Sequence, residues 1–316
     1  MSTNRLANNA GFTLAELLIS LAIAGIIATA ALQIFTTTTR TTTAQTNLSE
    51  AQQNLRAAMD RLAQHTRSAG FGLPDRGGFS LTFGTNTFTR AATVTNSSTG
   101  PDSLTLVGIG YDAGELEPFV TGSECNAAGK DCLTLSSADS VLANALYISV
   151  GGASFREVSS VVGKKITLTE QLDLPDDFFK ITPPPSIYII QALRYTIATD
   201  LTGCSTLHPC LAVQDLSGVT GSGNRQVLAQ GIEDLQIGIF ITPPAGGSAS
   251  FSDGSTTSSA DISALRLNLV GKTKTPDKAP IFQRPALEDR DAGSFDLFRR
   301  RVLTTVVKIR NPRPDS

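Results

Sequence analysis

The chain has 316 residues, of which 41% are hydrophobic and 17% are charged, and its formal net charge is −2. This composition excludes a wholly disordered chain, and the small net charge gives no general electrostatic argument for nucleic-acid binding. The length is sufficient for one large domain or two small ones with a hydrophobic core.

The N-terminus begins with a polar leader, residues 1–11, in which Arg5 is the only charged side chain. An apolar stretch follows at residues 12–35, and as a helix it would extend about 36 Å, enough to span a bilayer. Because a basic leader stays in the cytoplasm, the rest of the chain is expected to be exported. The stretch is compatible with a signal anchor, with a secretory signal cleaved at residues 28–30, or with a leader cleaved before the apolar run.

One acidic side chain, Glu16, lies inside this apolar stretch. A carboxylate there costs free energy in a bilayer, and in an isolated helix we expect it to have no partner. The charge argues against a secretory signal, whose apolar core does not normally contain an acid.

The sequence GFTLAELLISLAIAGIIA, residues 11–28, resembles the class III leader of type IV pilins and pseudopilins. The resemblance implies that a prepilin peptidase cleaves between Gly11 and Phe12, and that the new amino group of Phe12 is methylated. It also implies that Glu16 serves assembly by facing the Phe12 amino group of a neighbouring subunit.

The helix is expected to continue as an amphipathic segment through residues 36–70. The threonine-rich run at 36–43 has poor helix propensity, so local loosening is expected there. Gly70 and Gly72, followed by Pro74, predict the end of the helix. Apolar residues recur at helical spacing before that end and predict one buried face: Leu48, Ala51, Leu55, Ala58, Met59 and Leu62.

Residues 71–316 are expected to form a strand-rich globular head packed on the second half of the helix. Because helix-like stretches are few and short there, the predicted fold class is α+β. Long loops at 242–261 and 274–294 are expected to be functional or mobile. Short apolar runs bounded by turn residues predict strands at 103–110, 144–150, 164–170, 186–198, 225–241, 262–272 and 300–311.

The C-terminal part of the chain refines the resemblance. RRRVLTTVVKIRN, residues 299–311, resembles the closing strand of minor type IV pilins of the PilW kind. GIEDLQIGIF (231–240) and ISALRLNLV (262–270) resemble the paired late strands of that family. Residues 75–220 resemble no family.

Four cysteines occur as two close pairs, Cys125 with Cys132 and Cys204 with Cys210. In an exported chain such pairs predict two local disulfides. A zinc site with His208 as a further ligand is the alternative, but neither pair has the spacing typical of zinc ligands.

No catalytic, metal or cofactor site is expected. His65 and His208 lie outside known catalytic motifs, and His65 is expected to be solvated or to cap the helix. The acidic runs at 176–177 and 288–291 lack the spacing of a calcium loop and are expected to be solvated. Arg299, Arg300 and Arg301 are expected to form surface or interface ion pairs rather than a DNA-binding patch.

The resemblance implies a non-enzymatic minor pilin that joins or primes a type IV pilus through its N-terminal helix. Before assembly the protein would be held in the inner membrane with its head in the periplasm, and afterwards it would lie in the pilus at the cell surface. The expected partners are other pilins, the prepilin peptidase and the inner membrane; neither a nucleic acid nor a cofactor is expected. A minor pseudopilin of a type II secretion system is the nearest alternative, and the long loops leave a pilus-associated adhesin or DNA-binding subunit open.

Overall fold

The structure is a computed structural model of the chain, which separates into two units, Met1–Ser49 and Glu50–Ser316. The residues described are 13–73, 79–120, 124–137, 144–218, 221, 223–241, 251–253, 262–277 and 281–309.

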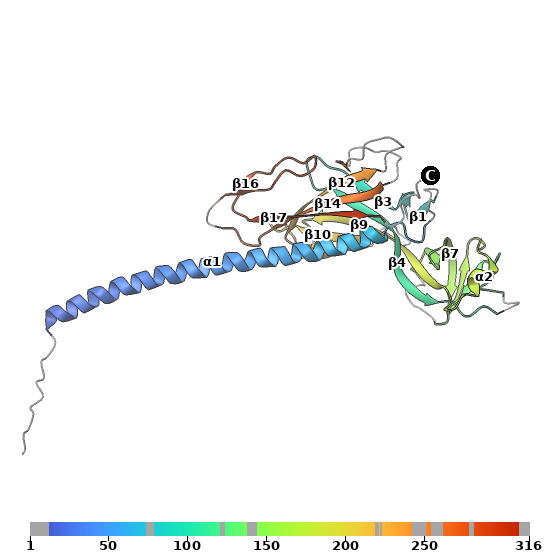
Figure 1. The fold of residues 1–316 in the computed structure, drawn as a ribbon, viewed down its shortest axis with the longest axis horizontal. Helices are drawn as coiled ribbons and strands as arrows, with labels where there is room; N and C mark the ends of the chain where they lie inside the picture. Colours follow the sequence, from blue (N-terminus) through green and yellow to red (C-terminus); the bar gives the residue numbers. More distant parts are fainter. Residues whose placement is uncertain are drawn as a thin grey trace, which may run out of the picture. The chain divides into compact units, whose positions relative to one another are not determined.

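One long helix, α1 (Leu14–Ser68), contains the apolar stretch and the amphipathic segment that follows it (Figure 1). The predicted loosening at 36–43 is wrong, because the helix is continuous there. The threonine hydroxyls donate to carbonyl oxygens one turn earlier: Thr39 Oγ1 to Phe35 O at 2.8 Å, and Thr43 Oγ1 to Thr39 O at 2.9 Å. Threonine in this rotamer keeps its polar group within the helix, so the run remains helical despite its low propensity.

The last turns of α1 pack into the second unit. The helix ends at Ser68, where Gly70 N donates a 2.8 Å hydrogen bond to the carbonyl of Val107 in β4 (Ser103–Glu115). Gly70 has a φ of 78°, a left-handed conformation that glycine adopts without strain. The buried residues of α1 recur every three or four positions, as the sequence predicts: Ala51, Leu55, Ala58, Met59, Leu62, Ala63 and Thr66.

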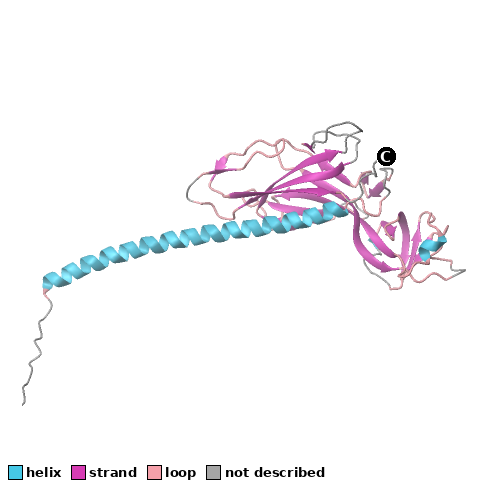
Figure 2. Ribbon diagram, in the orientation of Figure 1, coloured by secondary structure: helices cyan, strands magenta, loops and turns pink. Residues whose placement is uncertain are grey.

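The second unit is rich in strands, which form two main antiparallel sheets (Figure 2). The larger sheet has nine strands in the order β11-β10-β9-β6-β7-β8-β5, with β4 also paired to β9 and β3 paired to β4. Its further strands are β3 (Ala92–Thr95), β5 (Cys132–Thr134), β6 (Tyr147–Val150), β7 (Ser154–Val162), β8 (Lys165–Leu168), β9 (Ser186–Ala198), β10 (Cys210–Asp215) and β11 (Arg225–Gln230).

The smaller sheet has four strands in the order β13-β12-β14-β17. Two short ribbons, β1-β2 and β15-β16, and a one-turn helix, α2 (Asp176–Phe179), complete the described elements. The remaining strands are β1 (Leu81–Phe83), β2 (Asn86–Phe88), β12 (Ile232–Ile241), β13 (Phe251–Ser252), β14 (Ile262–Lys272), β15 (Phe282–Gln283), β16 (Phe295–Asp296) and β17 (Arg300–Lys308).

The long strands β4 and β9 contribute to three hydrophobic cores: one at each end of their pairing and a third that contains Val107 and Ile190. Their pairing extends from Leu104 opposite Tyr195 to Glu115 opposite Ser186. Leu104 and Tyr195 belong to the core that contains the end of α1 and both sheets. At the other end, Ile187 of β9 belongs to a second core beneath β5–β8 and α2, so one strand pair supports two lobes.

The predicted α+β class, with a long N-terminal helix and a strand-rich head, is confirmed. The run 225–241, which the sequence presents as one apolar stretch, is divided into β11 and β12 at Gly231. This glycine has a φ of 72°, which interrupts a strand.

Candidate functional site

The start of α1 is a candidate assembly site, of which Thr13 and Glu16 are described. Thr13 N and Thr13 Oγ1 donate to Glu16 Oε2 at 3.0 Å and 3.1 Å. In return, Glu16 N donates to Thr13 Oγ1 at 3.3 Å. This reciprocal pattern is a capping box, which satisfies backbone donors that a helix leaves free at its first turn.

The expectation that Glu16 has no partner in an isolated helix is therefore wrong. The carboxylate accepts two hydrogen bonds from Thr13 of its own chain. The spacing Thr-x-x-Glu before an apolar run is a readable sequence signal for this box. The expected cleavage and methylation positions, Gly11 and Phe12, lie outside the described residues.

The apolar half of α1 exposes its large side chains. Within this helix, an apolar segment near the N-terminus is long and apolar enough to cross a membrane, and none of that segment is buried within the protein. Apolar surface of this extent is stabilised by lipid or by other apolar helices. The exposed side chains include Leu14, Leu17, Leu18, Ile19, Leu21, Ile23, Ile26, Ile27, Leu32, Ile34 and Phe35.

Two disulfides close short loops in the second unit. Cys125 bonds to Cys132 across a separation of seven residues, and Cys204 bonds to Cys210 across six. Cys132 begins β5 and Cys210 begins β10, so each bridge ties a loop to the first residue of a strand.

The first residue of β17 carries a buried ion-pair network. The Arg300 side chain is 7% exposed; its Nη1 donates to Asp296 Oδ1 at 2.6 Å, and its Nε donates to Glu233. Lys272 Nζ lies 3.9 Å from both carboxylates and 4.1 Å from the centre of the Phe298 ring. Hydrogen bonding to Arg300 lowers the pKa of Asp296 from its usual value. The network joins β12, β14, β16 and β17.

The neighbouring arginines differ in their surroundings. Arg299 Nη2 pairs with Asp277 Oδ2 at 2.6 Å, and its guanidinium lies 5.5 Å from the centre of the Phe282 ring. Arg301 is exposed. Arg299 and Arg300 both form the expected ion pairs, but the pair of Arg300 is buried rather than on the surface.

In the acidic run at 288–291, Asp291 is exposed as expected, but the side chain of Glu288 is buried, which corrects the expectation from sequence for that residue. Glu288 is 6% exposed at its side chain, and it binds Arg266 of β14 through two hydrogen bonds of 2.8 Å and 2.7 Å. Asn268 Nδ2 also donates to Glu288, at 2.6 Å. A charged residue inside the apolar strand β14, Arg266, was the signal that a partner would be needed.

A second carboxylate holds the same loop. Asp234 of β12 is fully buried and pairs with two arginines of the loop, with Arg284 Nη1 at 3.0 Å and with Arg290 Nη1. A carboxylate without a partner in that position would be strongly unfavourable. The loop at residues 284–291 is thus fixed on the four-stranded sheet.

Asp102 lies next to this region and is 1% exposed. Its two carboxylate oxygens accept hydrogen bonds of 2.8 Å from Ser97 N and Ile237 N. The pKa of Asp102 is raised to about 6: burial is the main cause, the two hydrogen bonds oppose it, and the nearby carboxylates of Asp289 and Asp234 contribute to the rise.

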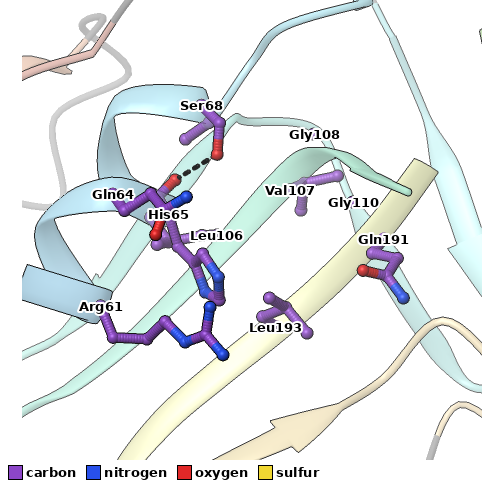
Figure 3. Close-up of a pocket in the computed structure, with 11 residues that line it drawn as sticks. Arg61, Gln64, His65, Ser68, Leu106, Val107, Gly108, Gly110, Gln191 and Leu193 are labelled. Atoms are coloured by element: carbon purple, nitrogen blue, oxygen red, sulfur yellow. Dashed lines mark hydrogen bonds between the residues drawn. The ribbon is translucent and has the colours of Figure 1, made fainter. Parts of the chain in front are cut away.

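A pocket of about 340 Å³ lies where the end of α1 meets β4 and β9 (Figure 3). His65 is half-buried in its wall, and its Nδ1 is hydrogen-bonded to the hydroxyl of Tyr195. The prediction that His65 is solvated or caps the helix is therefore wrong. Tyr195 is fully buried, and burial raises its pKa, so the phenol stays protonated at neutral pH. The lining residues are Arg61, Gln64, His65, Ser68, Ala69, Leu106, Val107, Gly108, Gly110, Gln191 and Leu193.

Other candidate sites from the sequence are kept apart by the fold. Asp176 accepts a hydrogen bond from Ala128 N at 3.1 Å, and Asp177 pairs with Lys180 at 3.3 Å. His208 packs against the Phe298 ring. Within the described ranges, no group of three or more His, Cys, Asp or Glu side chains is arranged to hold a metal ion.

Comparison with known proteins identifies a family motif at the N-terminus of the chain. A search of curated proteins found no match. Among solved structures, the chain is similar to a type IV-like pilin from Thermus thermophilus, at 12% sequence identity and a TM-score of 0.40. The similarity covers 83% of this chain and 97% of that one. At the N-terminus, residues 6–32 match the family described as the prokaryotic N-terminal methylation motif. The chain therefore carries a prokaryotic N-terminal methylation motif at the start of its long helix.

Proposed function

We propose that this protein is a minor type IV pilin of the PilW kind, a non-enzymatic subunit that joins or primes a pilus through α1. The observation that carries the proposal is the combination of the methylation motif at residues 6–32 with an exposed apolar helix directly behind it. A helix of this kind needs lipid or other helices around it. The inner membrane supplies lipid before assembly, and the filament supplies other helices afterwards.

In this function the inner membrane stores the subunit before assembly. A prepilin peptidase removes residues 1–11, and the amino group of Phe12 is methylated. The strand-rich unit is exported, and the two disulfides support an oxidising compartment such as the periplasm. After assembly, the helix packs with the helices of other pilins.

Glu16 has two states in this proposal. Before assembly, its carboxylate accepts the hydrogen bonds from Thr13 that complete the capping box. In the filament it faces the methylated amino group of Phe12 on a neighbouring subunit. A positive amine beside a carboxylate in apolar surroundings is strongly favoured over either charge alone, so this contact selects one axial register for the helices.

The test is incorporation into pili. Pili sheared from cells that produce the tagged protein should contain it, and deletion of its gene should reduce the number of pili seen by electron microscopy. Both results together support the minor pilin.

The nearest alternative predicts another outcome. A minor pseudopilin of a type II secretion system would be absent from sheared pili, and deletion of its gene would abolish secretion while pili remained. That pair of results would contradict the proposal.

A further inference from the structure

The pocket at the end of α1 has a fixed backbone frame. Gly108 of β4 lies so close to the helix end that a Cβ on it would be 2.7 Å from Ser68 O and 3.0 Å from Gly70 N. A bridge between Ala69 and Gly108 and the bond from Gly70 N to Val107 O hold the two segments together. Contacts of this kind leave the backbone little freedom, so the pocket is present before any ligand binds.

Two donor side chains point into the pocket from the same face of α1. Arg61 and His65 are separated by one helical turn, which places them as neighbours on the helix surface (Figure 3). Burial and, to a smaller extent, the positive charge of Arg61 lower the pKa of His65, so the two groups influence each other electrostatically. The Tyr195 hydroxyl occupies Nδ1 of His65 and leaves Nε2 as the nitrogen available to a ligand.

The positive charge of Arg61 is not neutralised inside the protein. Within the part of the chain that the structure describes, Arg61 is not in an ion pair. The carboxylate of Asp215, behind the β9 wall, is already engaged: it accepts hydrogen bonds from Gln191 Nε2 at 3.3 Å and from Ser217 N at 2.8 Å. Asp215 forms no ion pair with Arg61, so its carboxylate does not neutralise that guanidinium.

The carbonyl groups at the end of α1 are also occupied. The carbonyl oxygen of His65 accepts from Ser68 Oγ at 3.0 Å, that of Thr66 from Ala69 N at 3.3 Å, and that of Ser68 from Phe71 N at 3.1 Å. These bonds reduce the negative field that a helix C-terminus normally presents. The polar groups of α1 that remain for a ligand in the pocket are thus the guanidinium of Arg61 and Nε2 of His65.

We propose that this pocket binds a carboxylate group, which comes either from a small organic acid or from an acidic side chain of a partner protein. The planar guanidinium of Arg61 matches the two oxygens of a carboxylate, and His65 Nε2–H adds a donor in the tautomer in which the Tyr195 hydroxyl donates to Nδ1. A volume of about 340 Å³ is enough for such a group and several atoms attached to it. Glycine at position 110 leaves room for the side chain of Gln191, whose Oε1 would lie 1.9 Å from a Cβ at that position, so a polar amide also lines the pocket.

The two histidines of the chain make a direct test possible. The full chain, in detergent micelles and labelled with ¹³C and ¹⁵N in histidine only, gives one imidazole signal from the pocket and one from His208. The His208→Gln variant assigns them. Succinate is then added at constant pH and ionic strength, and in a parallel experiment a short blocked peptide containing one glutamate is added.

We expect a saturable shift of the His65 signal with at least one of the two probes, and no shift of the His208 signal. Arg61→Gln should weaken binding about tenfold or more, because it removes a charge-assisted pair. Arg56→Gln, which changes an exposed arginine on the same helix outside the pocket, should leave the affinity unchanged.

Saturation by succinate alone identifies a small acid as the source, and saturation by the peptide alone identifies a protein side chain. Two results overturn the proposal: no saturable shift with either probe, or equal binding by the wild type and the Arg61→Gln variant.

Discussion

The carboxylate of Glu16 accepts hydrogen bonds from both the backbone N–H and the side-chain hydroxyl of Thr13, at 3.0 Å and 3.1 Å. This relationship gives the acid a local function at the first turn of the helix, in addition to the proposed contact with a neighbouring subunit. The two functions depend on different properties of the side chain: capping needs an acceptor, whereas the contact between subunits needs a negative charge.

Glu16→Gln and Glu16→Ala separate these properties. Glutamine keeps an acceptor for the capping box but removes the charge. If the charge sets the register, both variants should be inserted and cleaved normally but should be depleted from sheared pili to a similar extent, as measured by immunoblot. Thr13→Ala, which removes the hydroxyl and keeps the charge, is the control and should still be incorporated. Incorporation of Glu16→Gln at the wild-type level would contradict the charge mechanism.

The mature chain is expected to begin at Phe12. Mass spectrometry of the purified protein should find an N-terminal peptide that starts with methylated Phe12. Replacing Gly11 by a bulky residue should leave the uncleaved precursor in the inner membrane, because the peptidase requires a small residue at that position. A mature chain that begins at residue 31, or that keeps Met1, would rule out the pilin interpretation.

The stability of the head should depend on the ionisation of Asp102. Its pKa is 3.8 in an unperturbed chain and about 6 in the folded protein, so the folded state binds the proton more tightly. The free energy of unfolding contributed by Asp102 is therefore greatest below about pH 4, falls by about 3 kcal/mol as the pH rises to about 6, and is constant above that.

Chemical denaturation of the full chain in detergent micelles at several pH values measures this effect. The difference in unfolding free energy between the wild type and Asp102→Asn should change with pH in that interval. The same difference for Asp173→Asn, at an exposed position, should be flat. If the difference in unfolding free energy between the wild type and Asp102→Asn also did not change with pH, the pKa of Asp102 would not be changed by folding, and the prediction would be wrong.

Arg300 should contribute far more to stability than its neighbour in the sequence. Arg300→Ala removes the hydrogen-bonded partner of Glu233 and Asp296 and leaves them only Lys272, 3.9 Å from each; breaking a buried ion pair typically costs about 3–5 kcal/mol. Arg301→Ala, at an exposed position of the same strand, should change the unfolding free energy by less than about 0.5 kcal/mol. Similar losses in the two variants would contradict a specific function of the network.

The Cys204–Cys210 bridge should stabilise the protein by about 2 kcal/mol, because a short loop restricts the unfolded chain only modestly. Replacing both cysteines by serine and measuring the unfolding midpoint under non-reducing conditions tests this value. Peptide mapping without reduction should recover each local pair, and a fragment that joins Cys125 to Cys204 would contradict the pairing.

Features with a short sequence period were predictable. The helix has a buried face at the expected positions from Ala51 to Leu62, although Leu48 is only half-buried, and the strand expected at 186–198 is β9 (Ser186–Ala198). Both follow from the local spacing of apolar residues. The Thr-x-x-Glu spacing at Thr13 and Glu16 was also readable, since a capping box is local in sequence.

Features that join distant residues were not predictable from one sequence. Glu233 and Arg300 are 67 residues apart, and His65 and Tyr195 are 130 residues apart. The sequence shows that charges lie within apolar strands, and therefore that partners are needed, but several partners would satisfy each charge. The second core, beneath β5–β8 and α2, was also not predictable from the sequence. Its strands are short, and it depends on how the two long strands β4 and β9 are paired.

The pairing of β4 with β9 has a mechanical consequence. Residues 50–68 of α1 are attached to the middle of β4 through Gly70 and Val107, so a pull along this helical segment enters the sheet at that point. The hydrogen bonds between β4 and β9 lie across the strands, and a load along the strands shears them together rather than breaking them one at a time. A load applied along these strands would therefore be shared by the hydrogen bonds of a pairing that extends from Leu104 to Glu115.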